Sequence, residues 1–280
     1  MLLLATGPNG LQLVLLVIIG LLAGVLGGLL GIGGGLVMIP AMLLLIGEHA
    51  YGPDSLHLYK LAALVSAVLL SIAALRQHIR AGAIQPRVLE GAIPAGFVGV
   101  ALGVLLAGLL SGDLTHVLRR IFGAFMILAV LLSLWMRRST RAPEGAAAPP
   151  ARSAGGRLRA AAIVGLPAGV VSGLLGVGGG VWAVPAQHAL MGIGLRSAIA
   201  NSAGLVLAQT AAAAVGMSLT VANMPALRVA DGLWLALFLV PGALAGGGVG
   251  AALVHRLPVG AVRGVFYVVL VAAGLRLMLG

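Results

Sequence analysis

Apolar runs separated by short polar connections make up most of this 280-residue chain. A helix that crosses a bilayer needs about 20 predominantly apolar residues, and most of the runs approach that length. The pattern therefore predicts an all-α polytopic membrane protein. The runs are 11–30, 36–47, 58–75, 88–110 and 117–136 in the first half, and 160–175, 181–192, 197–215, 234–254 and 260–279 in the second.

A polar segment divides these runs into two sets of five. Residues 137–159 are rich in Ala, Pro, Gly and Arg, a composition that cannot bury an apolar core. We therefore expect a first membrane repeat over residues 1–136, a solvated linker over 137–159 and a second membrane repeat over 160–280.

A glycine-rich motif occurs at matching places in the two sets. GLLGIGGGLVMIP at 28–40 corresponds to GLLGVGGGVWAVP at 173–185, which indicates an internal duplication. Each glycine inside a helix costs about 0.5–1 kcal/mol relative to alanine, so both helices should break there. Paired breaks inside a membrane are typical of the central binding site of a secondary transporter. The runs that follow, 36–47 and 181–192, are short enough to be half-helices.

Basic residues predict the orientation of the chain. Six arginines lie in the linker, whereas the N-terminal flank has none and the C-terminal flank has Arg276, so the linker should be cytoplasmic and both termini periplasmic. The connection at 76–87 carries three arginines and its counterpart at 216–228 carries one, which favours inverted repeats of five segments each. Parallel repeats of four crossings each are the alternative. Because the first basic residue is Lys60, the N-terminal run should be a retained span and not a signal peptide.

Composition narrows the possible functions. The mean hydropathy is +1.16 and 8% of the residues are charged, so the net charge of +11 orients membrane spans and indicates no nucleic-acid partner. All six acidic residues lie in connections or at the ends of runs, which favours an anionic over a cationic substrate. The sequence has no Walker A motif, no G-x-S-x-G elbow, no cysteine and no His/Glu metal spacing. We therefore expect neither an enzyme nor a bound cofactor or metal.

The glycine motifs and nearby polar residues form the candidate site. Exposed glycine amides at a helix start can bind an anion, although glycines also allow close helix packing. Lys60 and Arg196 occupy aligned positions and could form a cation pair facing the anion, or they could be interfacial residues. The candidate substrate-binding residues are Gly33, Gly34, Gly35, Lys60, Gly178, Gly179, Gly180, Arg196, Ser197, Asn201, Ser202 and Gln209, with Gln187 and His188 as candidates for proton or ligand contact.

The doubled motif, GIGGGLVMIP and GVGGGVWAVP, resembles the sulfite exporter TauE/SafE family, within the toluene sulfonate uptake-type permease group. The resemblance covers essentially the whole chain and implies a permease of the bacterial inner membrane for a small sulfur-containing anion such as sulfite or an organosulfonate. We expect export by alternating access, coupled to protons or to the membrane potential. A non-transporting scaffold or sensor subunit and a passive anion channel are the alternatives. The oligomeric state is left open.

Overall fold

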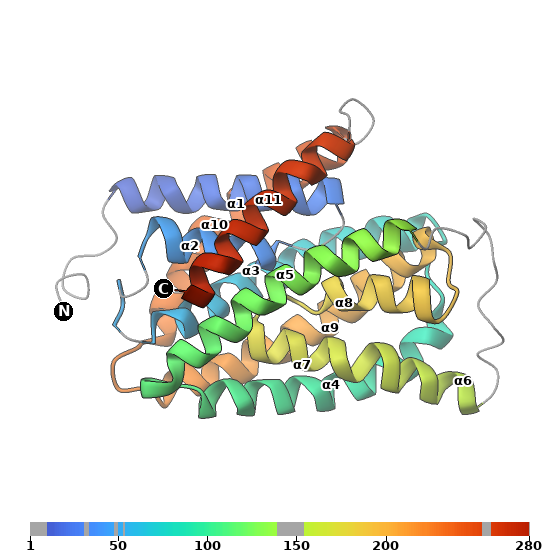
Figure 1. Cartoon of the computed structure of the whole chain (residues 1–280), viewed down its shortest axis with the longest axis horizontal. Helices are drawn as coiled ribbons and strands as arrows, with labels where there is room; N and C mark the ends of the chain where they lie inside the picture. Colours follow the sequence, from blue (N-terminus) through green and yellow to red (C-terminus); the bar gives the residue numbers. More distant parts are fainter. Residues whose placement is uncertain are drawn as a thin grey trace.

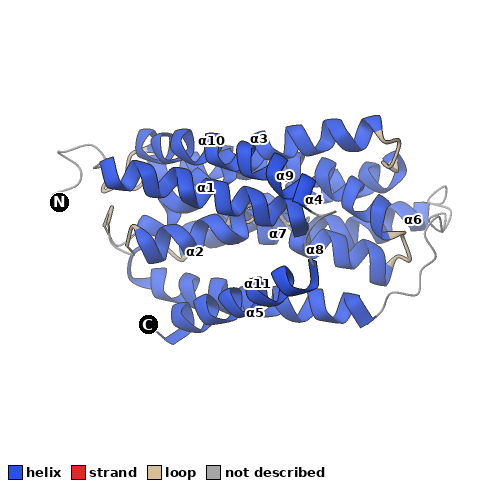
Figure 2. Cartoon of the chain, turned by 90° about the horizontal axis from the view of Figure 1, so that it is seen from above, coloured by secondary structure: helices blue, strands red, loops and turns tan. Residues whose placement is uncertain are grey.

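The structure, a computed structural model, describes residues 10–30, 34–47, 50–52, 54–138, 154–253 and 259–279. Every regular element in these ranges is helical, and the helices lie side by side in one bundle (Figures 1 and 2). Seven helical segments within the described ranges are long and apolar enough to cross a membrane. The expected all-α, multi-pass membrane protein is therefore confirmed.

Two sets of helices follow the two sets of apolar runs. The first set is α1 (Gly10–Leu30), α2 (Gly35–Leu45), α3 (Ser55–Arg80), α4 (Pro86–Leu109), the short η1 (Gly112–Leu114) and α5 (Thr115–Arg138). The second set is α6 (Ala154–Arg159), η2 (Ala160–Gly165), α7 (Leu166–Leu175), α8 (Gly180–Pro185), η3 (Ala186–Leu190), α9 (Leu195–Ala222), α10 (Val229–Leu253) and α11 (Val259–Leu279).

The helix break predicted for the second glycine motif is present. The last residue of α7 is Leu175 and the first of α8 is Gly180, so residues 176–179 form a loop, which we call the second glycine loop. In the first motif α2 begins at Gly35, while residues 31–33, including the candidate Gly33, lie outside the described residues. Short helices follow both motifs, since α2 has 11 residues and α8 has six before η3.

Glycines bring two pairs of long helices into backbone contact. Glycines of α1 lie against backbone carbonyl groups of α10, and glycines of α10 lie against those of α1. The same reciprocal contact occurs between α4 and α7. In lipid, where no hydrophobic force drives helices together, such close van der Waals packing holds neighbouring helices. The glycines involved are Gly20, Gly24, Gly242 and Gly246 in the first pair, and Gly99, Gly103, Gly169 and Gly173 in the second.

The remaining long helices complete the bundle. α3 packs against α9 and α10, and α5 packs against α11. Residues 55–64 at the start of α3 are buried on every side, which places this segment in the centre of the bundle. Figure 1 shows the start of α1 and the end of α11 at one end of the bundle, and the end of α5 and the start of α6 at the other. We call these the terminus end and the linker end.

Substituting Gly246 by alanine should destabilise the bundle, because the added Cβ would overlap the backbone carbonyl of Leu21. A forced overlap of this kind typically costs about 1–3 kcal/mol. Gly248, two residues further along α10, has no atom within 4 Å of an added Cβ. Gly248→Ala should therefore leave the thermal midpoint unchanged or raise it, since alanine is the better helix former by about 1 kcal/mol. Scanning fluorimetry of both variants in detergent measures the difference, and equal midpoints would contradict tight α1–α10 packing.

Candidate functional site

The two glycine motifs contact each other inside the bundle. A Cβ added at Gly35, the first residue of α2, would lie 3.0 Å from both the carbonyl oxygen of Gly176 and the Cα of Val177. Both segments are buried. The start of one short helix and the loop that precedes the other therefore form a single region, assembled from both halves of the sequence.

The second glycine loop has a backbone that favours glycine. The φ angles of Gly176, Gly178 and Gly179 are +76°, +85° and +68°, values that side chains strongly disfavour. Gly34 instead has the helical φ of −75°, so the two motifs do not share one conformation over their described residues. Gly180 is the first residue of α8 and is buried. Successive glycines with left-handed backbone can turn amide groups toward one concave point, as in anion-binding nests.

Lys60 packs directly on this loop. A Cβ at Gly176 would lie 2.9 Å from the Cβ of Lys60, so only glycine allows the lysine stem to approach so closely. The Lys60 side chain is 0% exposed, and its Nζ has no hydrogen-bond partner among the described residues. Burying an ammonium without a counter-charge is costly.

Two further polar atoms without partners flank the same loop. Gln209 of α9 donates a hydrogen bond from Nε2 to the carbonyl of Gly165 at 3.2 Å, while its Oε1 faces Gly179 and has no partner among the described residues. The buried hydroxyl of Ser172, one helical turn before Gly176, also has none there. Buried polar groups normally find partners. The buried polar atoms without partners near the second glycine loop therefore come from three helices, α3, α7 and α9.

A second group of predicted residues forms a closed network. Asn201 donates from Nδ2 to Oε1 of Gln187 at 3.0 Å, and Gln187 donates from Nε2 to the hydroxyl of Ser202 at 3.0 Å. The backbone N–H of Gln85 donates to Oδ1 of Asn201 at 2.7 Å. These bonds join α9 to η3 and to the start of α4. Because these side chains hydrogen-bond to one another and to the backbone, they link the helices together in this conformation.

His188 lies beside this network and is 5% exposed. Its Nδ1 is 2.8 Å from the carbonyl oxygen of Ile193. Since a carbonyl can only accept, Nδ1 carries the hydrogen and Nε2 is the basic nitrogen. Nε2 has no partner among the described residues, so His188 stays a candidate for proton or ligand contact.

Arg196 and Ser197 lie away from Lys60. Arg196 is exposed, Ser197 is half-buried, and both are at the start of α9. Arg196 lies close enough to His78 for an electrostatic interaction, and His78 is 18 residues beyond Lys60 on α3. At 1.5 Å per residue, Lys60 and His78 lie about 27 Å apart along the helix, so Arg196 lies near the opposite end of α3 from Lys60. The structure therefore does not assemble Lys60 and Arg196 at one site.

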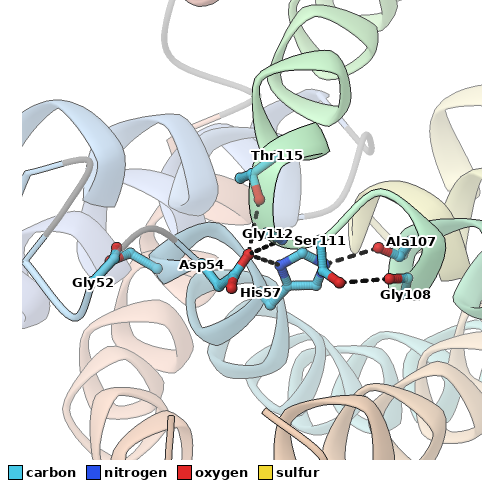
Figure 3. Close-up of polar contacts among 9 residues, drawn as sticks. Gly52, Asp54, His57, Ala107, Gly108, Ser111, Gly112 and Thr115 are labelled. Carbon is cyan, nitrogen blue, oxygen red and sulfur yellow. Dashed lines mark hydrogen bonds and ion pairs between the residues drawn. The ribbon is translucent and has the colours of Figure 1, made fainter. Parts of the chain in front are cut away.

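Asp54 and His57 were not recognised in the sequence as site residues. Asp54 precedes α3 and His57 lies in its first turn, and their side chains face each other (Figure 3). Lys60 follows His57 by three residues on the same helix. The available signal was the spacing of three polar residues, 54, 57 and 60, at the start of an otherwise apolar helix.

Comparison with known proteins agrees with this architecture. The family model described as Sulfite exporter TauE/SafE matches residues 16–277. Two relatives are each named probable membrane transporter protein MamO. The one from Paramagnetospirillum magneticum is 30% identical over 294 residues, covering 97% of this chain and 45% of the relative. The one from Magnetospirillum gryphiswaldense is 29% identical over 282 residues, covering 93% and 44%.

The chain thus spans less than half the length of these curated relatives. No solved structure matches it. The match to the family model includes both glycine motifs and all the long helices in whole or in large part. The chain therefore belongs to the sulfite exporter TauE/SafE family.

Proposed function

We propose that the chain is a secondary transporter that exports a small sulfur oxyanion, such as sulfite or an organosulfonate, across the bacterial inner membrane. The family and the transporter relatives support a membrane transporter, which is a class of protein distinct from enzymes. The sulfur anion follows from the family description. The contacts described above support the proposed position of the site and the proposed role of each residue.

The buried ammonium of Lys60 carries this proposal. Burying a lone cation is unfavourable by several kcal/mol in practice. Lys60 is nevertheless buried next to Gly176, where the two glycine motifs contact each other. A bound oxyanion would supply the missing counter-charge and charge-assisted hydrogen bonds. In the same site the loop at 176–179 offers backbone amides, Ser172 offers a hydroxyl, and Gln209 offers an acceptor for a protonated oxygen of the anion.

Alternating access requires two bodies that move against each other, and we propose that inverted repeats provide them. In the second half, α6, η2 and α7 together form the first segment, α8 with η3 the second, α9 the third and α10 the fourth. α1 with α10 and α4 with α7 are therefore pairs of the same kind, because each joins the first segment of one half to the fourth segment of the other. The equivalent helices α3 and α9 run in opposite directions, as the neighbouring positions of Leu75 with Gly204 and of His78 with Arg196 require. Inverted-topology repeats typically surround a central site of this type.

Replacing Lys60 by glutamine should weaken anion binding, because the charge that faces the anion is lost. Loss of a desolvated charge partner costs about 2–5 kcal/mol, so the KM for sulfite should rise at least about tenfold. Counterflow of radiolabelled sulfite in proteoliposomes, with competing anions, gives the KM. Arg196→Gln is the control, since that side chain is exposed and distant from Lys60. A wild-type KM in Lys60→Gln would reject the proposed site.

Alanine at Gly176 should impair transport more than its effect on stability explains. The new Cβ would press on the Lys60 stem, at 2.9 Å, in a residue with φ +76°. Gly192 has a similar φ of +69° but no atom within 4 Å of an added Cβ. Gly192→Ala therefore carries a comparable backbone strain of about 1–2 kcal/mol without the contact. Counterflow rates normalised to protein amount should fall in Gly176→Ala and stay near wild type in Gly192→Ala, and equal losses would refute the role of the contact.

The orientation should follow the arginine distribution, with the linker end in the cytoplasm. Exposed Ala81 follows α3 at the linker end, and exposed Asn223 follows α9 at the terminus end. Because the chain has no cysteine, Ala81→Cys and Asn223→Cys can each be labelled without background. A membrane-impermeant maleimide applied to spheroplasts should label Cys at position 223 and spare the one at position 81. The reverse pattern would place the linker outside and invert the proposed topology.

A further inference from the structure

A buried Asp–His pair lies beside Lys60, and the proposed function above does not use it. The side chain of His57 is 0% exposed and that of Asp54 is 17% exposed, and the two side chains face each other (Figure 3). Nε2 of His57 is 3.0 Å from the carbonyl oxygen of Ala107 in α4. Nδ1 of His57 is 3.9 Å from Oδ1 of Asp54.

These contacts determine which nitrogen of His57 is basic. The carbonyl of Ala107 can only accept, so in the neutral ring Nε2 carries the hydrogen and donates it. Nδ1 then bears the lone pair and points toward Asp54, whose carboxylate is also only an acceptor. This explains why Nδ1 has no hydrogen-bond partner among the described residues. A proton added at Nδ1 would face the carboxylate of Asp54 across 3.9 Å and would turn two facing acceptors into an ion pair.

Asp54 is held in place for this role by other groups. The backbone N–H of Gly112 donates to Asp54 Oδ1 at 3.0 Å, and the hydroxyl of Thr115 donates to the same oxygen at 2.8 Å. These donors come from η1 and from the first residue of α5. The carboxylate therefore keeps its position whether His57 is neutral or protonated.

Lys60 links this pair to the proposed anion site. Lys60 is three residues beyond His57 on α3 and interacts with it electrostatically. The charged groups that act on the His57 ring are Lys60 and Asp54, while α4 contributes the carbonyl of Ala107 and α5 the neutral hydroxyl of Thr115. Without an anion, a proton on His57 is repelled by the Lys60 ammonium. An anion bound to Lys60 cancels that repulsion, so the proton and the anion favour each other's binding.

We propose that Nδ1 of His57 is the proton-binding site that couples anion transport to proton movement. The proton is taken from water through Asp54, becomes the Nδ1–H of the imidazolium and travels with the anion, to be released when the anion leaves. One proton and one anion thus move in the same direction, whichever way the gradients drive them. This coupling rests on the proposed anion site at Lys60.

Sulfite transport under a pH gradient tests the coupling. In proteoliposomes, each unit of transmembrane pH difference should change the accumulation ratio of labelled sulfite by about tenfold through one coupled proton. His57→Gln should lose this response and raise the KM for sulfite while counterflow at equal pH stays measurable, because glutamine can still donate to Ala107 but brings no proton to the anion. Sulfite binds a proton of its own near neutral pH, but wild type and variant meet the same sulfite species, so their difference reports His57.

Two matched variants separate protonation from structure. His116 is an exposed histidine in the first turn of α5, and its ring contacts the backbone carbonyl of Asp113 in η1. His116→Gln should keep the full pH response. Thr115→Val removes one of the two hydrogen bonds that hold Asp54, without changing charge, and should weaken the pH response without abolishing it. Asp54→Asn keeps an oxygen for Gly112 and Thr115 but removes the charge, and should shift the response toward lower pH.

Nitrogen-15 NMR of histidine-labelled protein in nanodiscs observes the ring directly. The His57 signal, absent in His57→Gln and shifted in Asp54→Asn, should show the Nε2–H tautomer at alkaline pH and gain a proton on Nδ1 as the pH falls. Sulfite should raise the midpoint of that titration in wild type and have no effect on it in Lys60→Gln. An Nδ1–H tautomer, a midpoint that sulfite leaves unchanged, or a wild-type pH response in His57→Gln would overturn the coupling. Absence of sulfite counterflow in wild type would instead reject the proposed function.

Discussion

The burial of one ammonium group, that of Lys60, constrains the centre of this protein. The group lies in a bundle without a counter-charge among the described residues, and its stem reaches that position only because residue 176 is a glycine. Residues 176–179 of the second glycine motif thus have two roles. They open the helix backbone at the centre of the bundle, and they leave room for a side chain that would otherwise be excluded.

Glycine also determines which parts of the bundle are stiff. α1 with α10 and α4 with α7 approach so closely that backbone touches backbone over two helical turns, which leaves little space for the helices of a pair to slide. The contacts of α3 and α9 with these pairs are made largely by side chains, such as Leu61 with Gly232 and Val104 with Gly216. Movement is easier across side-chain contacts than across interlocked backbone. We therefore expect the two glycine pairs to move as units around α3 and α9.

Sequence patterns predicted the fold better than the site, for a physical reason. Length and composition fix where spans lie, and the cost of clustered glycines fixes where a helix breaks, so both are local properties. Arg196 shows the limit. Arg196 aligns with Lys60 in the sequence, but α9 runs antiparallel to α3. Arg196 therefore lies near the end of α3 that is far from Lys60. Asn201 and Gln187 were correctly singled out as unusual in an apolar setting, yet only the tertiary contact between α9 and η3 shows that they satisfy each other.

Charge balance joins the anion site to the Asp–His pair. Lys60 and a bound, singly charged anion balance each other, but the Asp54 carboxylate adds a negative charge beside His57. With His57 neutral, that charge has no cation of its own once the anion is bound to Lys60, which a low-dielectric surrounding disfavours. Protonation of His57 restores neutrality, because the imidazolium faces the Asp54 carboxylate. The same proton is bound more weakly when the anion is absent, since it would then add to the charge of Lys60.

A transporter built in this way needs no carboxylate at the centre of its spans, and the acidic residues of this chain indeed lie in connections and at the ends of apolar runs. The coupling group is a neutral base that becomes cationic only when the substrate requires a counter-charge.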